Sequence, residues 1–171
     1  MVIWIIGLSG AGKTTLASEI VAQIRRVRQN IVLIDGDVIR EVFGNDLGHS
    51  LDDRRRNAER ICRLCKFLDD QGIHVVCAIL SLFKESREWN RLNIGSYYEI
   101  FIDAEVSSLI ERDPKGIYRK FLSGEIKDVA GMDMEFPRPE NADLVIANSR
   151  QRDDLLGHAA AIAERILATG Q

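Results

Sequence analysis

Short apolar runs alternate along this chain with longer segments in which apolar residues recur every three or four positions. The runs predict buried strands at residues 2–6, 31–34, 73–80, 97–102 and 144–147. The helical period predicts a short helix that ends at Phe43 and longer helices over residues 15–29, 51–72, 85–92, 105–111 and 151–168. Residues 112–141 are polar, contain all three prolines and form the least regular segment.

Strands that alternate with helices predict an α/β fold in which a five-stranded parallel sheet has helices on both faces. The length of 171 residues suits a single domain, residues 1–171, with a substantial core. In such a sheet, ligands bind at the carboxyl ends of the strands. We therefore expect the residues that follow the predicted strands to meet at one edge and to form the site.

Residues 7–14 read Gly-Leu-Ser-Gly-Ala-Gly-Lys-Thr, which fits the phosphate-binding loop G-x-x-x-x-G-K-[ST] between a strand and a helix. The glycines let backbone N–H groups converge on phosphate oxygens, and the start of the helix adds positive potential. Lys13 supplies a charge for the β- and γ-phosphates, and Thr14 supplies a hydroxyl ligand for Mg²⁺. The sequence thus predicts the P-loop nucleoside triphosphate hydrolase/kinase fold, with ATP bound by Gly7, Leu8, Ser9, Gly10, Ala11, Gly12, Lys13, Thr14 and Thr15.

The net charge of −3 argues against a nucleic-acid partner bound by bulk electrostatics. No apolar run has the length of a membrane span, and the amino terminus lacks the basic segment and cleavage site of a signal peptide. The three cysteines, an odd number, indicate reduced thiols and a cytoplasmic protein. Cys62 and Cys65 form a C-x-x-C pair at helical spacing among apolar residues, which favours core packing over redox or metal chemistry.

The position of the acidic residues indicates which reaction the loop serves. The strand at residues 73–80 lacks the terminal carboxylate that motors and GTPases use for Mg²⁺, and the chain has no Asn-Lys-x-Asp signature. Acids instead follow the second predicted strand, at Asp35 and Asp37. A carboxylate there faces the γ-phosphate from the acceptor side and can orient or deprotonate a hydroxyl. This favours a small-molecule kinase, although a turn with a helix cap also explains Asp-Gly-Asp.

Further segments resemble the adenylylsulfate kinase (APS kinase) family over nearly the whole chain. Besides the loop, the matching residues are Asp35-Gly36-Asp37 with Arg40, Asp46-Leu47-Gly48, Arg54, Asn57, residues 112–118 (Arg-Asp-Pro-Lys-Gly-Ile-Tyr) and residues 124–127 (Gly-Glu-Ile-Lys). The resemblance implies ATP-dependent phosphorylation of the ribose 3′-hydroxyl of adenylylsulfate, with Mg²⁺ as a cofactor. It also implies a mobile lid over residues 112–134 and a homodimer.

The resemblance also assigns residues to the parts of the site. It implies catalytic roles for Lys13, Asp37 and Ser81, Mg²⁺ ligation by Thr14 and Asp37, and ATP contacts from Arg112. The family assigns Ser81 as a phosphoserine, but we expect direct in-line transfer without a covalent step. A small-molecule nucleotide acceptor would contact Asp35, Arg40, His49, Arg54, Asn57, Ile79, Leu80, Lys115 and Lys127. These side chains include the cationic and amide donors that an anionic nucleotide requires, and the lid lysines would neutralise phosphoryl charge on closure.

Three departures from the family pattern lie near the expected acceptor pocket. His49 replaces a Phe that stacks on the substrate base, Leu82-Phe83-Lys84 replaces Pro-Tyr-Arg, and Arg56 replaces a Glu. An imidazole stacks more weakly than a phenyl ring. The departures leave open another acceptor such as cytidine diphosphoramidate, the substrate of similar kinases in surface-polysaccharide synthesis. A nucleotide-gated interaction module is the alternative of another class, but such a module does not need Asp37.

Overall fold

The computed structural model describes residues 1–148 and 152–168. Within them, one parallel sheet has the strand order β2-β3-β1-β4-β5. The strands are β1 (Val2–Ile6), β2 (Ile31–Asp35), β3 (His74–Ile79), β4 (Tyr97–Asp103) and β5 (Leu144–Ala147). The predicted fold class is confirmed, and β1 lies at the centre, so the loop that follows it emerges between the ends of β3 and β4.

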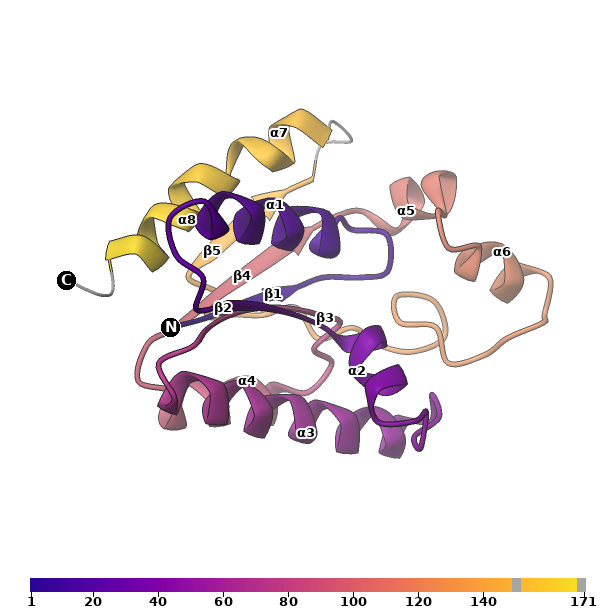
Figure 1. The fold of residues 1–171 in the computed structure, drawn as a ribbon. Helices are drawn as coiled ribbons and strands as arrows, with labels where there is room; N and C mark the ends of the chain where they lie inside the picture. Colours follow the sequence, from indigo (N-terminus) through magenta and orange to yellow (C-terminus); the bar gives the residue numbers. More distant parts are fainter. Residues whose placement is uncertain (149–151, 169–171) are drawn as a thin grey trace.

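Helices cover both faces of the sheet, as Figure 1 shows. One face is covered by α1 (Lys13–Arg25), α7 (Arg152–Gly157) and α8 (Ala159–Ala168), and the other by α3 (Leu51–Asp70) and α4 (Lys84–Asn93). Three short helices lie at the end of the sheet where the strands finish (Figure 1): α2 (Gly36–Val42), α5 (Val106–Arg112) and α6 (Ile117–Leu122).

The central strand explains why the core has two layers. Every residue of β1 is 0% exposed, because helices cover the sheet on both sides. Ile3 and Ile5 pack in the cluster that contains α1 and α8, whereas Trp4 packs in the cluster that contains α3. Cys62 and Cys65 belong to this second cluster as buried free thiols, which confirms the prediction of core packing.

The helix boundaries differ from the sequence predictions in two places. Helix α1 ends at Arg25 rather than at residue 29, because Val27 and Arg28 both donate to the carbonyl of Ile24 in a closing turn. The predicted helix over residues 151–168 is two helices that meet at His158, after Gly157 ends the first; residue 151 lies outside the described residues.

Helix α6 lies inside the segment that the sequence marked as least regular. It starts after Gly116, whose φ of 66° is left-handed. Both carboxylate oxygens of Asp113 accept hydrogen bonds from backbone N–H groups of its first turn, those of Tyr118 (3.2 Å) and Arg119 (2.9 Å). The segment is too short for its period to show, and its cap depends on Asp113 reaching forward across Pro-Lys-Gly.

Candidate nucleotide and acceptor site

The predicted phosphate-binding loop follows β1 and leads directly into α1. Gly10 and Gly12 have φ values of 76° and 97°, a region that side chains with a Cβ rarely adopt. A Cβ on Gly12 would also lie 2.5 Å from the Leu155 side chain of α7. Both glycines are therefore needed for the backbone conformation, and Gly12 also for the close approach of α7.

Lys13 and Thr14 begin α1 and face the acids after β2. The Lys13 ammonium donates a hydrogen bond to the carbonyl of Leu8 at 2.8 Å, so the side chain folds back over its own loop. Burial, followed by the nearby charge of Lys115, lowers the pKa of Lys13 to about 8. The Thr14 hydroxyl donates to Asp35 at 2.7 Å, and a second oxygen of Asp35 accepts from the Asp37 backbone at 2.9 Å. Asp35 thus caps α2 and also contacts the loop.

Asp37 forms an ion pair with Lys115 at 2.7 Å, across the opening between α2 and the predicted lid. Burial alone raises the pKa of Asp37, but the hydrogen bond and charge of Lys115 outweigh it and bring the pKa below its usual value. The same contact raises the pKa of Lys115. Both groups are therefore charged at neutral pH, and Asp37 is a carboxylate with a cationic neighbour from the lid.

Two adjoining cavities connect the loop with the helices on the other side of Asp37. The larger, about 300 Å³, is lined by the loop, Asp35, Asp37, Pro114 and Lys115, among others. The smaller, about 80 Å³, is lined by residues of α2, α3 and the turn after β3. The residues that line both cavities are Gly36, Asp37, His49, Arg54, Ile79 and Leu80. The smaller cavity also includes Ala58, which the sequence did not indicate, and Leu82 and Phe83, two of the departures from the family pattern that were expected near the acceptor pocket.

Most of the predicted acceptor residues line these two cavities, but five predicted site residues do not: Gly7, Leu8, Ala11, Arg112 and Lys127. Asp35 and Lys115 line the larger cavity, Arg40 and Asn57 line the smaller, and His49 lines both. Lys127 is exposed on the lid and lines neither cavity. Arg112 also lies outside them, at the end of α5.

The two arginines of the pocket are held by backbone carbonyl groups. Arg40 donates to the carbonyls of Leu47 (3.2 Å) and Gly48 (2.6 Å). Arg54 donates to the carbonyl of His49 at 2.8 Å and to that of Asp128 in the lid at 3.0 Å. These contacts fix the loop that carries His49. Burial, followed by the charges of Arg40 and Arg54, lowers the pKa of His49, so its imidazole is neutral at pH 7.

Asn57 differs from the arginines because part of its side chain has no partner. Its amide nitrogen lies 3.5 Å from the carbonyl of Gly36, at the limit of a hydrogen bond. Its carbonyl oxygen Oδ1 is buried without a hydrogen-bond donor, although Asn57 lines the smaller cavity. A buried amide oxygen without a donor is costly, so a ligand that supplies an N–H or O–H group there would gain a favourable contact.

Ser81, predicted as a catalytic residue, lies directly beyond β3 and lines the smaller cavity. It is 4% exposed, and its hydroxyl accepts a hydrogen bond from the indole N–H of Trp4 at 3.1 Å. The hydroxyl therefore has a structural partner in the core. Its catalytic role stays a prediction.

The predicted lid, residues 112–134, lies against the phosphate-binding loop. Pro114 packs near Gly10, and the Tyr118 hydroxyl donates to the carbonyl of Ser9 at 3.0 Å. Tyr118 is only 1% exposed. The lid is thus anchored by a buried aromatic residue, which its polar sequence did not indicate.

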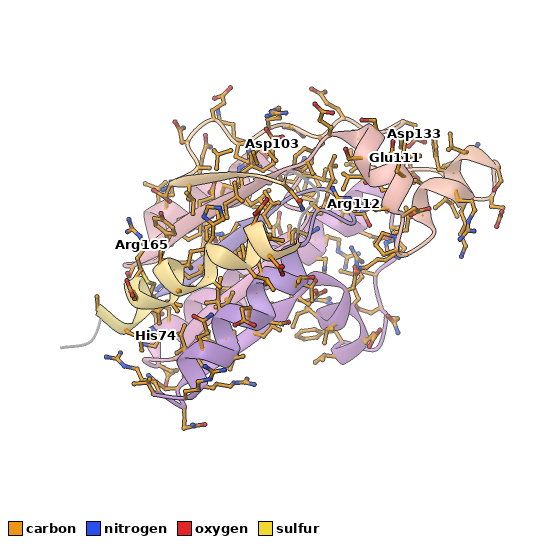
Figure 2. All side chains as sticks on the ribbon, turned by 90° about the horizontal axis from the view of Figure 1, so that it is seen from above. His74, Asp103, Glu111, Arg112, Asp133 and Arg165 are labelled. Carbon is orange, nitrogen blue, oxygen red and sulfur yellow. The ribbon has the colours of Figure 1, made fainter. Side chains whose placement is uncertain are left out.

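Asn148 supports the phosphate-binding loop, although no sequence motif marks it. It follows β5, and its amide donates to the carbonyl of Ala11 in the loop at 2.8 Å. Its carbonyl oxygen accepts from Arg112 at 3.5 Å. Figure 2 places Arg112 at the end of the molecule opposite His74 and Arg165. The position of Asn148 could have indicated its role, because a polar residue that directly follows a parallel strand lies at the same edge of the sheet as the site residues.

The oxygen atoms near the loop suit a hard cation. Thr14, Asp35 and Asp37 all line the larger cavity, and such oxygen donors are the protein ligands that Mg²⁺ takes alongside substrate phosphates and water. Among the described residues, no group of three or more His, Cys, Asp or Glu side chains is arranged to hold a metal by itself.

None of the helices within residues 1–148 and 152–168 is both long enough and apolar enough to cross a membrane.

Comparison with known proteins places this geometry in a family. The family model described as adenylylsulphate kinase matches residues 1–147. A cytidine diphosphoramidate kinase of Campylobacter jejuni is 41% identical over 151 residues, 86% of each chain. An adenylyl-sulfate kinase of Clostridium kluyveri is 36% identical over 150 residues, which cover 87% of this chain and 75% of the relative.

A solved structure of an APS kinase is also similar to this chain. The APS kinase CysC of Mycobacterium tuberculosis, in complex with AMPPNP and APS, has a TM-score of 0.85 and 30% sequence identity, over 97% of this chain and 96% of that one. The family match and the kinases among the relatives show that the chain is a phosphotransferase that acts on a hydroxyl. The chain belongs to the adenylylsulphate kinase family.

Proposed function

We propose that this protein is an ATP-dependent kinase that phosphorylates the ribose 3′-hydroxyl of adenylylsulfate. The observation that carries the proposal is that two adjoining cavities share Asp37. One contains the phosphate-binding loop, and the other contains cationic and amide side chains on the far side of that carboxylate. A γ-phosphate on the loop and a hydroxyl in the smaller cavity would both lie beside Asp37, as in-line transfer requires.

The residues of this chain supply positioning, charge and a proton acceptor. Lys13 moves from the Leu8 carbonyl to the β- and γ-phosphates, and Lys115 adds positive charge from the lid. The acceptor oxygen forms a bond to the γ-phosphorus as the bond to the ADP oxygen breaks, and the hydroxyl proton passes to Asp37 or to solvent. Mg²⁺, held by Thr14 with Asp35 or Asp37, would neutralise charge on the phosphate oxygens.

The smaller cavity supports an anionic nucleotide as the acceptor. Arg40 and Arg54 place positive charge on its wall, and the buried oxygen of Asn57 lacks the hydrogen-bond donor that a ribose hydroxyl or an amino group would supply. The name of the Clostridium relative and the APS bound to the Mycobacterium structure agree with adenylylsulfate as that acceptor.

A specific observation favours a second acceptor, cytidine diphosphoramidate. His49 lines both cavities where an aromatic ring was expected, and its neutral imidazole gives a smaller stacking surface that also forms hydrogen bonds. The Campylobacter relative, at 41% identity, is named for this substrate.

A coupled ATP-consumption assay with a panel of nucleotide acceptors tests the proposal. Adenylylsulfate should support turnover with kcat/KM well above that of cytidine diphosphoramidate, and turnover by the Lys13→Ala variant should be roughly 10³-fold lower. A preference for cytidine diphosphoramidate would mean that this compound, and not adenylylsulfate, is the acceptor. If ATP binds but no acceptor is phosphorylated, the interaction-module alternative is favoured instead.

The proposal also includes a homodimer and a cytoplasmic location, which agree with the reduced cysteines and the family resemblance. Light scattering on the purified protein measures the assembly directly, and a monomer at micromolar concentration would remove that part of the proposal.

A further inference from the structure

Ser81 has an unusual backbone conformation for a buried residue. In the described chain, Asn45, Ser81 and Asp128 are the residues other than glycine with φ above 50°. Asn45 and Asp128 are exposed, whereas Ser81 is buried, with a φ of 55°. Left-handed backbone is unfavourable for a residue with a Cβ and persists only where its surroundings enforce it. The neighbours of Ser81, residues 79–83, all line the acceptor cavity.

Two hydrogen bonds hold this turn in place. Arg87 of α4, itself 6% exposed, donates to the Ser81 carbonyl at 2.9 Å. Trp4 of β1 donates to the Ser81 hydroxyl at 3.1 Å. The turn is thus fixed on its carbonyl by a buried group of the following helix α4 and on its side chain by a buried group of β1. A bond from a charged donor is the stronger kind, and the dry surroundings strengthen it further.

Arg87 is held in turn by a buried carboxylate. Glu99 of β4 is 2% exposed and lies 3.9 Å from the Arg87 guanidinium. Glu99 also accepts a hydrogen bond from the Tyr97 hydroxyl at 2.8 Å, and it lies 3.8 Å from Arg91. Arg91 contacts Asp143 as well, and Ser81 is not among its partners. Glu99 therefore has two cationic neighbours, of which Arg87 reaches the turn.

We propose that Arg87 is a positioning residue for the acceptor: its bond to the Ser81 carbonyl holds the turn after β3 in the shape that forms one wall of the acceptor cavity. The proposal rests on the proposed kinase function. In this role, Arg87 acts together with Trp4, whose hydrogen bond to the Ser81 hydroxyl holds the same turn beside the site. It predicts that Arg87 affects acceptor binding and leaves the phosphate-binding loop unaffected.

Steady-state kinetics on Arg87→Met and Arg87→Lys test this. Loss of a hydrogen bond from a charged donor should raise the KM for the acceptor on the order of tenfold, while the KM for ATP changes by less than about twofold. Arg87→Lys keeps a cation and a donor, so it should recover most of the acceptor affinity. Arg91→Met is the matched control, because it removes a cation from Glu99 without touching Ser81; it should leave both KM values unchanged.

A second variant covers the case in which Arg87→Met fails to fold. Glu99→Gln keeps the side-chain shape and removes the charge that faces Arg87 and Arg91. Because Arg87 alone of these two reaches the turn, Glu99→Gln should raise the acceptor KM by a smaller factor than Arg87→Met and leave the KM for ATP unchanged. Equal rises in both KM values, no rise at all, or the same rise in Arg91→Met would overturn the proposal. A wild-type protein that phosphorylates no acceptor would instead contradict the kinase function itself.

Discussion

The phosphate-binding loop and the acceptor cavity adjoin each other but are built differently. The loop is one continuous stretch between β1 and α1, and its shape depends on glycines with left-handed backbone. The acceptor cavity is assembled from α2, α3, the turn after β3 and the loop that carries His49. The first site is formed mainly by backbone, and the second by side chains from distant segments.

This difference explains where the family pattern varies. Backbone N–H groups are the same for any sequence that allows the loop conformation, so the loop keeps one function across many kinases. A cavity made of side chains changes with each substitution. His49, Leu82 and Phe83 depart from the family pattern, and all three line the acceptor cavity. Nucleotide binding and acceptor choice are therefore separable, and substitutions should affect them separately.

The largest effect is expected on the phosphate side. Lys13→Ala removes the one loop side chain that places a charge on the transferred phosphate, so turnover should fall roughly 10³-fold, as for loss of a transition-state donor. The thermal midpoint should change little, because Lys13 contacts only a carbonyl of its own loop. Lys66→Ala, which removes an exposed lysine paired with Asp70, is the control and should retain activity. Wild-type turnover in Lys13→Ala would show that the loop is not the ATP site.

Asp37 lies where the two sides meet. Asp37→Asn keeps the shape and removes the charge, and we expect a loss of about 10²-fold in kcat, the usual scale for a positioned acid–base group. Ser81→Ala should cost much less, because the Ser81 hydroxyl is bonded to Trp4 in the core. Rapid-quench measurement of phosphoryl transfer compares the two. The opposite ranking, together with a trapped phosphoserine, would establish a covalent step.

The pH dependence of nucleotide binding should come from the phosphate side. Lys13 has a pKa of about 8 in the ligand-free protein, so it loses its positive charge as the pH rises through 8. ATP affinity should therefore fall by about tenfold between pH 7 and pH 9, with proton uptake on binding in that range. Calorimetry in two buffers of different ionisation enthalpy measures both quantities. Lys13→Ala should abolish the proton uptake, and equal uptake in that variant would assign the proton to another group.

The smallest effect is expected on the acceptor side. Base stacking on a good aromatic platform contributes roughly 1–3 kcal/mol, so His49→Phe should change the KM for adenylylsulfate several-fold and kcat less. If adenylylsulfate is the natural acceptor, the wild type uses it well and the substitution changes little or helps. If the acceptor is a cytidine compound, wild-type KM for adenylylsulfate is high and His49→Phe lowers it. Initial rates against both substrates decide between these outcomes.

The sequence by itself determined the strands, the parallel α/β architecture and the phosphate-binding loop. Each of these depends on neighbours in the chain: apolar runs for strands, and a glycine-rich motif between a strand and a helix for the loop. The rule that ligands bind at strand ends then placed Asp35 and Asp37 beside Thr14 and Lys13, and the structure brings them together. The sequence did not predict the short helix α6, because the helix is capped by a single carboxylate, that of Asp113.

Only the tertiary structure decided how the acceptor side is built. Arg40 and Arg54 line the acceptor cavity, and both also donate to carbonyl groups that the sequence does not single out, those of Leu47 and Gly48 for Arg40 and that of His49 for Arg54. Arg87 and Asn148 carried no motif, because their partners are the carbonyls of Ser81 and Ala11, which a sequence does not distinguish from any other. Hydrogen bonds to backbone depend on where the chain lies in space, so their donors become recognisable only after the chain has folded.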